Sequence, residues 1–166
     1  MFRQSVPVEA EPEPGRIRRR DAAAPQRNFY QTLQAYLNAF HQAWGIETLF
    51  SPPREELPVL PAAVEDQLLH IVQEALVNIR KHAGARRVEV FMTLRSGEMT
   101  LSIRDDGRGF DLQLAPGTKE EHFGLSIMRE RVEQVGGRLE IRSFLGHGTQ
   151  LFVYIPIPST ASTENP

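Results

Sequence analysis

Two short stretches carry polar residues whose types and spacing suit the binding of a charged ligand. The first is IRDDGRGF, residues 103–110, in which two aspartates and two glycines follow directly after an apolar run. Charge repulsion and backbone entropy both oppose order in such a stretch. An aspartate at the end of a strand can accept hydrogen bonds from an exocyclic amine and from a water on the ring. Asp105, followed by Gly107 and Gly109, therefore predicts the base end of a nucleotide site, because a carboxylate beside the phosphates would be repelled.

Two alternatives stay open for this stretch. Asp-Gly is a common turn dipeptide, so an ordinary turn also explains DDGRGF. Asp106 could take the place of Asp105, although the spacing to the two glycines favours Asp105.

The second stretch is a predicted helix with a row of four polar residues, Glu74, Asn78, Lys81 and His82. Residues at 100° intervals place this row opposite an apolar stripe that must face a sheet, formed by Leu68, Val72, Ala75, Leu76 and Ile79. A carboxylate, an amide oxygen four residues later and two potential cations in the next turn suit a divalent ion and the phosphates that it bridges. An ordinary solvent-exposed helix face explains the same residues, since surface helices are rich in Glu, Asn and Lys.

Further glycine sites follow along the chain. Gly124 stands where a helix is expected to begin, so free backbone N–H groups and the helix dipole would favour an anion there. The polar stretch between Phe110 and Phe123 has the length of a movable lid. GHGT, residues 146–149, fits a plain hairpin turn and a ligand contact equally well.

The periodicity of apolar residues predicts the elements that must position these groups. Three- and four-residue spacing predicts helices, and alternating runs bounded by turn residues predict strands. This order favours an α+β fold, a two-layer sandwich of a mixed, mostly antiparallel sheet with helices on one face. The expected helices span 28–44, 62–82 and 124–135, and the expected strands span 46–50, 86–94, 99–105, 138–144 and 149–156.

Composition narrows the class of protein. The chain has 166 residues, 40% of them hydrophobic, which is enough for one domain with a real core. A formal net charge of −2 gives no overall footprint for nucleic acid, so we expect no direct nucleic-acid partner. The chain has no cysteine, no apolar run long enough to span a membrane and no signal-like N-terminus, which predicts a cytoplasmic location.

The ends of the chain differ from its middle. Residues 1–27 mix prolines with an acidic EAEPEP and a basic RIRRR, and the last residues read STASTENP. Neither end offers apolar residues that could anchor a core. We therefore expect a flexible tail or linker at 1–27, a ligand-binding domain at 28–157 and a flexible tail at 158–166.

Four motifs occur together in one order: EALVNIRKHA, DDGRGF, HFGLSIMRERV and GHGT. In this set the chain resembles the catalytic and ATP-binding domain of sensor histidine kinases, which belong to the GHKL ATPases with gyrase, HSP90 and MutL. The MRERV helix and NIRKHAGA resemble most closely the nitrate-sensor-like subfamily. The resemblance covers about residues 28–157 and implies the Bergerat-type ATP-binding fold, with ATP and Mg²⁺ as cofactors.

The resemblance also implies a role for each matching residue. Asn78 would hold Mg²⁺, and Glu74 would orient water or assist proton removal. Asp105 would accept from the adenine amine. The remaining residues implied for the ATP site are Lys81 and His82 at the phosphates, Gly107 and Gly109 in the pocket, Gly124 and Leu125 at the lid hinge and phosphate site, and Gly148 and Thr149 on the adenine side.

In such kinases the γ-phosphoryl group passes to a histidine on a separate dimerisation domain, and a response regulator acts downstream. Residues 1–27 contain no histidine, and His41 lies on a helix whose neighbours look like core. We therefore expect either a fragment of a longer kinase or a stand-alone ATP-binding relative, which in both cases would not phosphorylate itself alone. Two other hypotheses stay open: an anti-sigma-type serine kinase or switch that grips a partner, and a hydrolytic ATPase in which Glu74 activates water.

Overall fold

A computed structural model describes residues 28–54, 60–111 and 119–157, and the side chains of residues 119–123 are not described. The two predicted tails, at 1–27 and 158–166, lie outside the described residues. Most of the predicted lid between Phe110 and Phe123 lies outside them as well.

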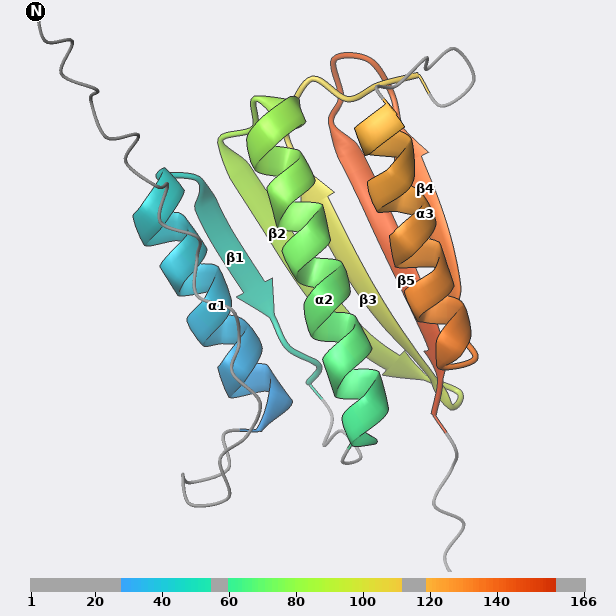
Figure 1. Cartoon of the computed structure of the whole chain (residues 1–166). Coiled ribbons are helices and arrows are strands. Elements are labelled where there is room, and N and C mark those ends of the chain that lie inside the picture. The colour runs from blue at the N-terminus through green and yellow to red at the C-terminus, as the bar shows by residue number, and fades with distance from the viewer. Residues whose placement is uncertain (1–27, 55–59, 112–118, 158–166) are drawn as a thin grey trace, which may run out of the picture.

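The described elements follow the predicted order of helix, strand, helix, two strands, helix, two strands (Figure 1). The second helix is extended by a short π-helical segment, η1, at its C-terminal end. The elements are α1 (Phe29–Trp44), β1 (Glu47–Ser51), α2 (Ala62–Asn78), η1 (Ile79–Ala83), β2 (Arg87–Arg95), β3 (Glu98–Asp105), α3 (Lys119–Gln134), β4 (Arg138–Ser143) and β5 (Thr149–Pro156).

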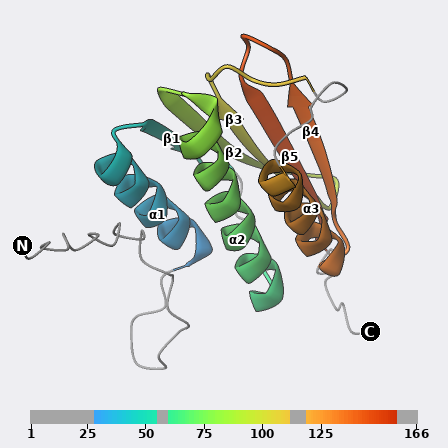
Figure 2. The ribbon, with the colours of Figure 1, turned by 45° about the horizontal axis from the view of Figure 1, so that its top comes forward.

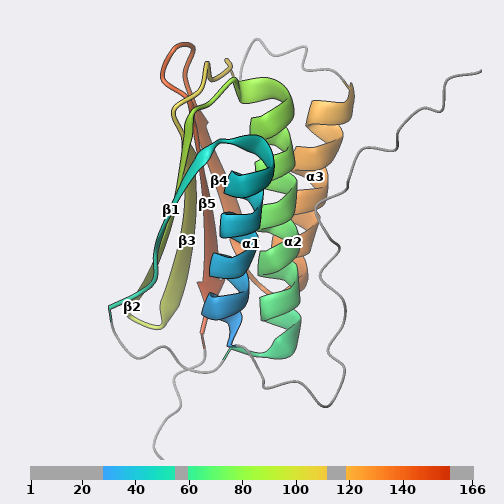
Figure 3. The same cartoon turned by 90° about the vertical axis from the view of Figure 1, so that its left-hand side faces the viewer.

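The strands form one sheet in the order β1-β2-β3-β5-β4. β1 runs parallel to β2, and the other neighbouring pairs are antiparallel. The three α-helices lie side by side (Figure 2), and the view along the sheet shows them in a single layer over one of its faces (Figure 3). The predicted α+β, two-layer sandwich with a mixed, mostly antiparallel sheet is confirmed.

The two faces of the sheet differ because side chains alternate along each strand. The face under the helices is apolar, and the open face carries charged and aromatic side chains. On the open face the Arg138 guanidinium lies 3.5 Å from the centre of the Tyr154 ring, and Arg142 lies 4.9 Å from the centre of the Phe152 ring. The strand side chains buried under the helices are Val88, Val90 and Met92 of β2, Met99, Leu101 and Ile103 of β3, and Leu151, Val153 and Ile155 of β5.

The helices cover this apolar face with the stripes that their sequences predict. On α2 and η1 every residue of the expected stripe is buried, namely Leu68, Val72, Ala75, Leu76 and Ile79. On α3 Met128 and Val132 are buried, while Leu125 and Val135 are partly buried against the core. Spacing of apolar residues was therefore sufficient to orient both helices.

The start of the third helix was predicted wrongly. α3 begins at Lys119, five residues before the expected start at Gly124. The residues between, KEEHF, include lysine and two glutamates, which favour helix, and a single interior glycine costs only about 1 kcal/mol. Gly124 therefore lies inside the helix.

Among the described residues, no helix is both long enough and apolar enough to cross a membrane.

Candidate functional site

A cavity of about 140 Å³ opens between the helix layer and the sheet. It lies where the C-terminal end of α2, the end of β3, the start of α3 and the loop between β4 and β5 come together, at the upper end of the molecule in Figure 1. Its lining comprises Ala75, Asn78, Ile79, His82, Ala83, Ile103, Asp105, Arg108, Gly109, Phe110, Leu125, Met128, Ile141, Thr149 and Leu151. The lining is mostly apolar with a few polar groups, which is the usual character of a small-molecule site.

Asp105 is the last residue of β3 and lines this cavity, although it is only 3% exposed. Its Oδ1 accepts a hydrogen bond of 2.8 Å from the Gly107 N–H, and its carboxylate accepts another from the Thr149 N–H. Burial raises the pKa of the Asp105 carboxyl, and these two hydrogen bonds offset only part of that effect. A buried carboxylate held by backbone groups is well placed to accept from a ligand.

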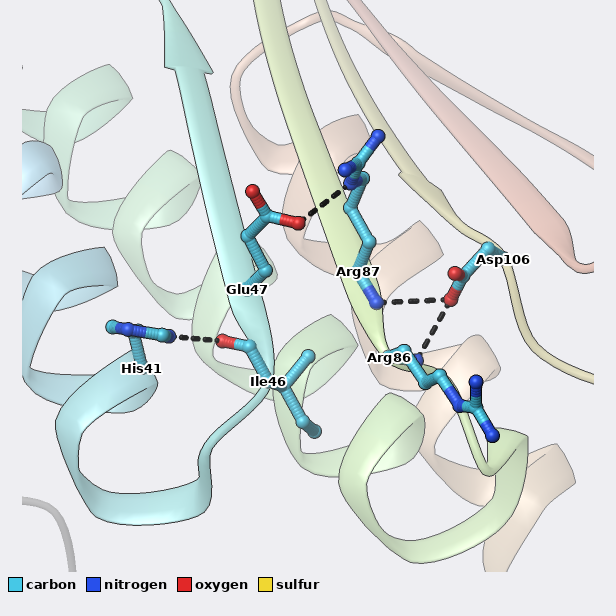
Figure 4. A network of polar contacts seen from close by, with 6 residues as sticks. All are labelled: His41, Ile46, Glu47, Arg86, Arg87 and Asp106. Carbon is cyan, nitrogen blue, oxygen red and sulfur yellow. Dashed lines mark hydrogen bonds and ion pairs between the residues drawn. The ribbon is translucent and has the colours of Figure 1, made fainter.

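Asp106, the alternative to Asp105, is exposed and is not part of the cavity lining. Its Oδ1 accepts from the backbone N–H groups of Arg86 at 2.8 Å and Arg87 at 2.9 Å (Figure 4). Partial burial acts to raise the pKa of Asp106, but these hydrogen bonds outweigh it and lower the pKa. Asp106 therefore stabilises the backbone at the start of β2, and Asp105 is the aspartate that lines the cavity.

The predicted polar row on the second helix is only partly brought to the cavity. Asn78 and His82 line it, whereas Lys81 is exposed and is not part of the lining. The segment from Ile79 to Ala83 is π-helical, so each turn takes up about one more residue than an α-turn. A residue three positions after Asn78 consequently falls well short of a full turn, which rotates Lys81 away from Asn78.

Glu74, one turn before Asn78, packs against α3 and does not line the cavity. A Cβ atom on Gly124 would lie 2.6 Å from Glu74 Oε1, and 3.4 and 3.6 Å from the two side-chain polar atoms of Asn78. The missing side chain at Gly124 thus lets α3 approach the polar row of α2 closely. The helix dipole and free N–H groups expected at Gly124 are not found there, because this residue lies in the second turn of α3. Leu125, the next residue, does line the cavity.

The glycines of DDGRGF and GHGT let two loops pack backbone against backbone. At Gly109, where φ is 60°, a Cβ atom would overlap the carbonyl oxygen of Phe144. At Gly148, where φ is 76°, a Cβ atom would overlap the carbonyl oxygen of Asp105. A Cβ atom on Gly107 would lie 2.5 Å from the carbonyl oxygen of Ala83, at the end of η1. Thr149 follows Gly148 and lines the cavity beside Asp105.

His41, the histidine considered as a phosphate acceptor, lies in the last turn of α1 and is not part of the cavity lining. Its Nδ1 donates to the carbonyl oxygen of Ile46 at 2.9 Å (Figure 4). This hydrogen bond links the last turn of α1 to the residue that precedes β1, so the His41 side chain has a structural role.

Several lining residues were not singled out from the sequence. Ile103 and Leu151 form part of the wall, and the sequence could have indicated both. Ile103 lies two residues before Asp105 on the same face of β3, and Leu151 lies two residues after Thr149 on the same face of β5. Arg108 and Phe110 lie inside the DDGRGF motif itself. Met128 belongs to the apolar stripe expected on the third helix, although nothing in the sequence showed that this stripe reaches the cavity, and Ile141 reaches it only through the packing of β4.

Comparison with known proteins gives one family. Residues 63–159 match the family of histidine kinase-, DNA gyrase B- and HSP90-like ATPases. The sensor histidine kinase LiaS of Bacillus subtilis is 38% identical over 102 residues, which cover 61% of this chain and 28% of LiaS. The histidine-protein kinase/phosphatase DegS of Brevibacillus brevis is 39% identical over 126 residues, covering 76% of this chain and 32% of DegS. The nitrate/nitrite sensor NarQ of Escherichia coli is 42% identical over 91 residues, covering 54% of this chain and 16% of NarQ.

A solved structure shares the fold. The histidine kinase domain of the blue-light activated histidine kinase EL346 from Erythrobacter litoralis superposes with a TM-score of 0.64 at 22% identity, covering 78% of this chain and 61% of that one. The chain spans 28% and 32% of the lengths of LiaS and DegS, so it corresponds to about a third of each. The resemblance to sensor histidine kinases that the four motifs suggested is confirmed. The match over 63–159, which takes in the cavity and most of the elements around it, places the chain in the histidine kinase-, DNA gyrase B- and HSP90-like ATPase family.

Proposed function

We propose that this chain is the ATP-binding catalytic domain of a sensor histidine kinase, which binds Mg-ATP and donates the γ-phosphoryl group to a histidine on a separate dimerisation domain. The observation that carries the proposal is that Asp105 and Asn78, from different elements, line one cavity. A carboxylate at one side and an amide with nearby polar groups at the other match a ligand with a flat base and a charged tail.

Asp105 is the base-reading group in this proposal. As a carboxylate it only accepts hydrogen bonds, so it pairs with the exocyclic amine of adenine. The apolar side chains around it, including Ile103, Leu151 and Met128, provide surfaces for a flat ring. Gly107, Gly109, Gly148 and Thr149 shape this side of the site, as the family resemblance implies.

Asn78 and Glu74 are the proposed polar groups at the phosphate side. Their side-chain oxygens approach the same point beside Gly124, from successive turns of one helix. The described residues contain no cluster of three or more His, Cys, Asp or Glu that could hold a metal on its own. The two side-chain oxygens of Asn78 and Glu74 fit Mg²⁺, because this ion commonly takes one or two protein oxygens and completes its shell with water and substrate phosphates.

Bound Mg²⁺ would neutralise charge on the phosphates. In the proposal Asn78 would hold the ion through Oδ1 and His82 would contact phosphate oxygens, whereas the exposed Lys81 would not. Glu74 orients the incoming nucleophile or assists removal of its proton, and Gly124 and Leu125 border the phosphates. The reaction then depends on positioning and charge neutralisation, since no covalent step by this domain is needed.

Nucleotide binding is tested by calorimetric titration of the purified chain with ATP, with and without Mg²⁺. We expect binding that requires Mg²⁺ and is lost in Asp105→Asn. Asp106→Asn is the matched control, because it removes the neighbouring charge outside the cavity and should keep the affinity. Unchanged ATP affinity in Asp105→Asn would reject the proposed site.

Phosphoryl transfer is tested with ATP labelled on the γ-phosphate and a separately purified dimerisation domain from a relative such as DegS. The proposal expects label on the histidine of that domain only when this chain is present. Steady phosphate release in the absence of an acceptor would instead favour a hydrolytic ATPase. A response regulator as the downstream partner, and action on the cytoplasmic side, belong to the same proposal.

A further inference from the structure

The lining of the cavity carries few charged groups. Among the described residues that line it, Asp105 is the one carboxylate and Arg108 is the one lysine or arginine. Asp105 is buried, whereas Arg108 is exposed. An arginine side chain keeps its positive charge at every pH at which proteins are folded. An anionic ligand in this cavity therefore meets one permanent cation, which comes from the DDGRGF loop.

Two backbone hydrogen bonds fix the position of Arg108 at the cavity. Its N–H donates to the carbonyl oxygen of Ala83 at 2.9 Å, and its own carbonyl oxygen accepts from the Gly146 N–H at 2.6 Å. Ala83 is the last residue of η1 and directly follows His82, which also lines the cavity. The backbone of Arg108 is therefore held between the C-terminal end of η1 and the loop between β4 and β5.

The neighbours of Arg108 in the loop are two glycines that lie against other backbone segments. A Cβ atom on Gly107 would run into the carbonyl oxygen of Ala83, and one on Gly109 would overlap the carbonyl oxygen of Phe144. A side chain at either position would force these segments apart. Arg108 is thus the residue of this Gly-Arg-Gly turn at which the fold accepts a side chain.

Lys81, to which the family resemblance assigns a phosphate contact, differs from Arg108 in position. Both residues are exposed, but only Arg108 is part of the cavity lining. Lys81 belongs to η1, whose π-helical turn rotates it away from Asn78, whereas the backbone of Arg108 is bonded to the last residue of that same segment. At the end of η1 the lining therefore has an arginine from a loop where the resemblance predicts a lysine from the helix.

The positive charge of Arg108 does not neutralise Asp105, although only three positions separate the two residues. Burial raises the pKa of the Asp105 carboxyl, the N–H groups of Gly107 and Thr149 lower it, and the charge of Asp106 raises it further. A guanidinium close to this carboxylate would lower its pKa strongly, and Arg108 exerts no such effect. The guanidinium therefore lies apart from the Asp105 carboxylate.

We propose that Arg108 binds the phosphate tail of the nucleotide and so takes the role that the resemblance assigns to Lys81. The inference rests on the proposed ATP-binding function. A guanidinium presents a planar fork of N–H donors that pairs with two phosphate oxygens at once, and such charge-assisted bonds are about twice as strong as neutral ones. Arg108 then acts at the end of the cavity where His82 lies, while Asp105 holds the base.

Calorimetric titration of the purified chain separates binding of the phosphates from binding of the base. The ligands are Mg-ATP and adenosine, which share the base and the ribose and differ in the phosphate tail. We expect Arg108→Gln to weaken Mg-ATP binding about tenfold and to leave the affinity for adenosine unchanged. The affinity of this variant for Mg-ATP should also depend less steeply on salt concentration, because one contact between opposite charges is lost.

Three further variants define the effect. Arg108→Lys keeps the charge without the planar fork, so its affinity for Mg-ATP should lie between those of the wild type and Arg108→Gln. Lys81→Gln and Arg104→Gln are the matched controls, since each removes one exposed cation that is not part of the cavity lining, from η1 and from β3. Both controls should keep the wild-type affinity for Mg-ATP.

The outcomes distinguish failure of the inference from failure of the proposed function. An unchanged affinity for Mg-ATP in Arg108→Gln, or a larger loss in Lys81→Gln, would overturn the inference and leave the proposed function intact. An equal loss of Mg-ATP and adenosine affinity in Arg108→Gln would also overturn it, because the arginine would then support the loop and not the phosphates. A wild type that binds neither ligand would reject the proposed function, and the inference with it.

Discussion

Asp105 combines burial with charge, and this combination opposes folding while it favours binding. Its pKa is raised mainly because the cavity and the core remove water from the carboxylate. A carboxyl group with a higher pKa in the folded state than in the unfolded state binds more protons when folded. Its ionised form therefore costs stability at neutral pH.

Comparison of the wild type with Asp105→Asn tests this cost as a function of pH. As pH rises from the ordinary carboxyl pKa of 3.8 through the raised folded pKa, the wild type should lose unfolding free energy relative to Asp105→Asn. The difference is measured by urea denaturation of both proteins across that range. A wild type that gains stability relative to the variant over the same range would contradict the assigned shift.

The affinity for ATP should change in the opposite sense with pH. Only the ionised Asp105 accepts two hydrogen bonds freely, so the affinity should fall as pH drops through the raised pKa. Titrations of the chain with ATP at several pH values measure this change in affinity. The same titrations with an adenosine analogue that lacks phosphates provide the control, because protonation of the phosphates cannot then affect the result. A pH-independent affinity for that analogue would argue against contact between Asp105 and the base.

At the level of elements, the close approach of α2 and α3 depends on Gly124. Glycine inside a helix costs about 0.5–1 kcal/mol relative to alanine. Here the absent Cβ leaves room for the carboxylate of Glu74, whose Oε1 would lie 2.6 Å from that atom. Because this oxygen is the far end of a flexible side chain, a methyl group displaces it at small energetic cost.

Gly124→Ala should therefore separate stability from activity. We expect unchanged or slightly higher thermal stability and retained ATP binding, with phosphoryl transfer slowed about tenfold or more because Glu74 is displaced. Glu74→Gln provides the comparison, and the double variant should be no slower than the slower single one. Transfer at the wild-type rate in Gly124→Ala would show that the position of Glu74 is unimportant.

The loop between β4 and β5 contains a matched pair of glycines. Both have left-handed backbone, with φ of 79° at Gly146 and 76° at Gly148. A Cβ on Gly146 would meet nothing within 4 Å, whereas one on Gly148 would overlap the Asp105 carbonyl oxygen. A comparison of substitutions at these two glycines therefore measures the effect of the close contact between the Gly148 backbone and the Asp105 backbone.

Gly146→Ala should lose about 1–2 kcal/mol of stability, the usual cost of left-handed backbone for a residue with a side chain. Gly148→Ala should lose more and should also lose nucleotide binding, since the Asp105 backbone must move. Thermal denaturation and ATP titration of the two variants measure both effects. Equal behaviour of the pair would mean that the loop contact is dispensable.

At the scale of the whole molecule, the folded domain is larger than the segment that matches the family. The family match begins at residue 63, after α1 and β1. Yet Leu33 and Leu37 of α1 are completely buried in the same core as the strands and helices of the matched span. β1 also extends the sheet by pairing with β2.

Leu37→Ala should consequently destabilise the whole domain by about 2–5 kcal/mol in a single cooperative transition. Leu49→Ala, in the neighbouring β1 but 42% exposed, is the control and should change stability by about 0.5 kcal/mol or less. Circular dichroism and tryptophan fluorescence during denaturation distinguish the outcomes, because Trp44 reports on α1. Separate transitions from the two probes would show that α1 and β1 fold independently.

The sequence by itself determined the element order, the apolar stripes of the helices and the grouping of four motifs into one site. These features follow from local spacing: periods of about 3.6 and 2 residues orient side chains, and glycines mark the turns. The stripe from Leu68 to Ile79 and the strands on either side of Gly97 needed no information from elsewhere in the chain.

Only the tertiary structure decided which polar residues reach the cavity. It separated Asp105 from Asp106 through bonds to Arg86 and Arg87, which lie about twenty residues earlier in the chain. The π-helical segment after α2 turns Lys81 away from the cavity. Gly124, expected at the start of a helix, lies instead inside α3 where this helix packs against α2. The physical reason is common to all three: each depends on contacts or backbone geometry set by packing between distant segments, which side-chain spacing along a single segment does not encode.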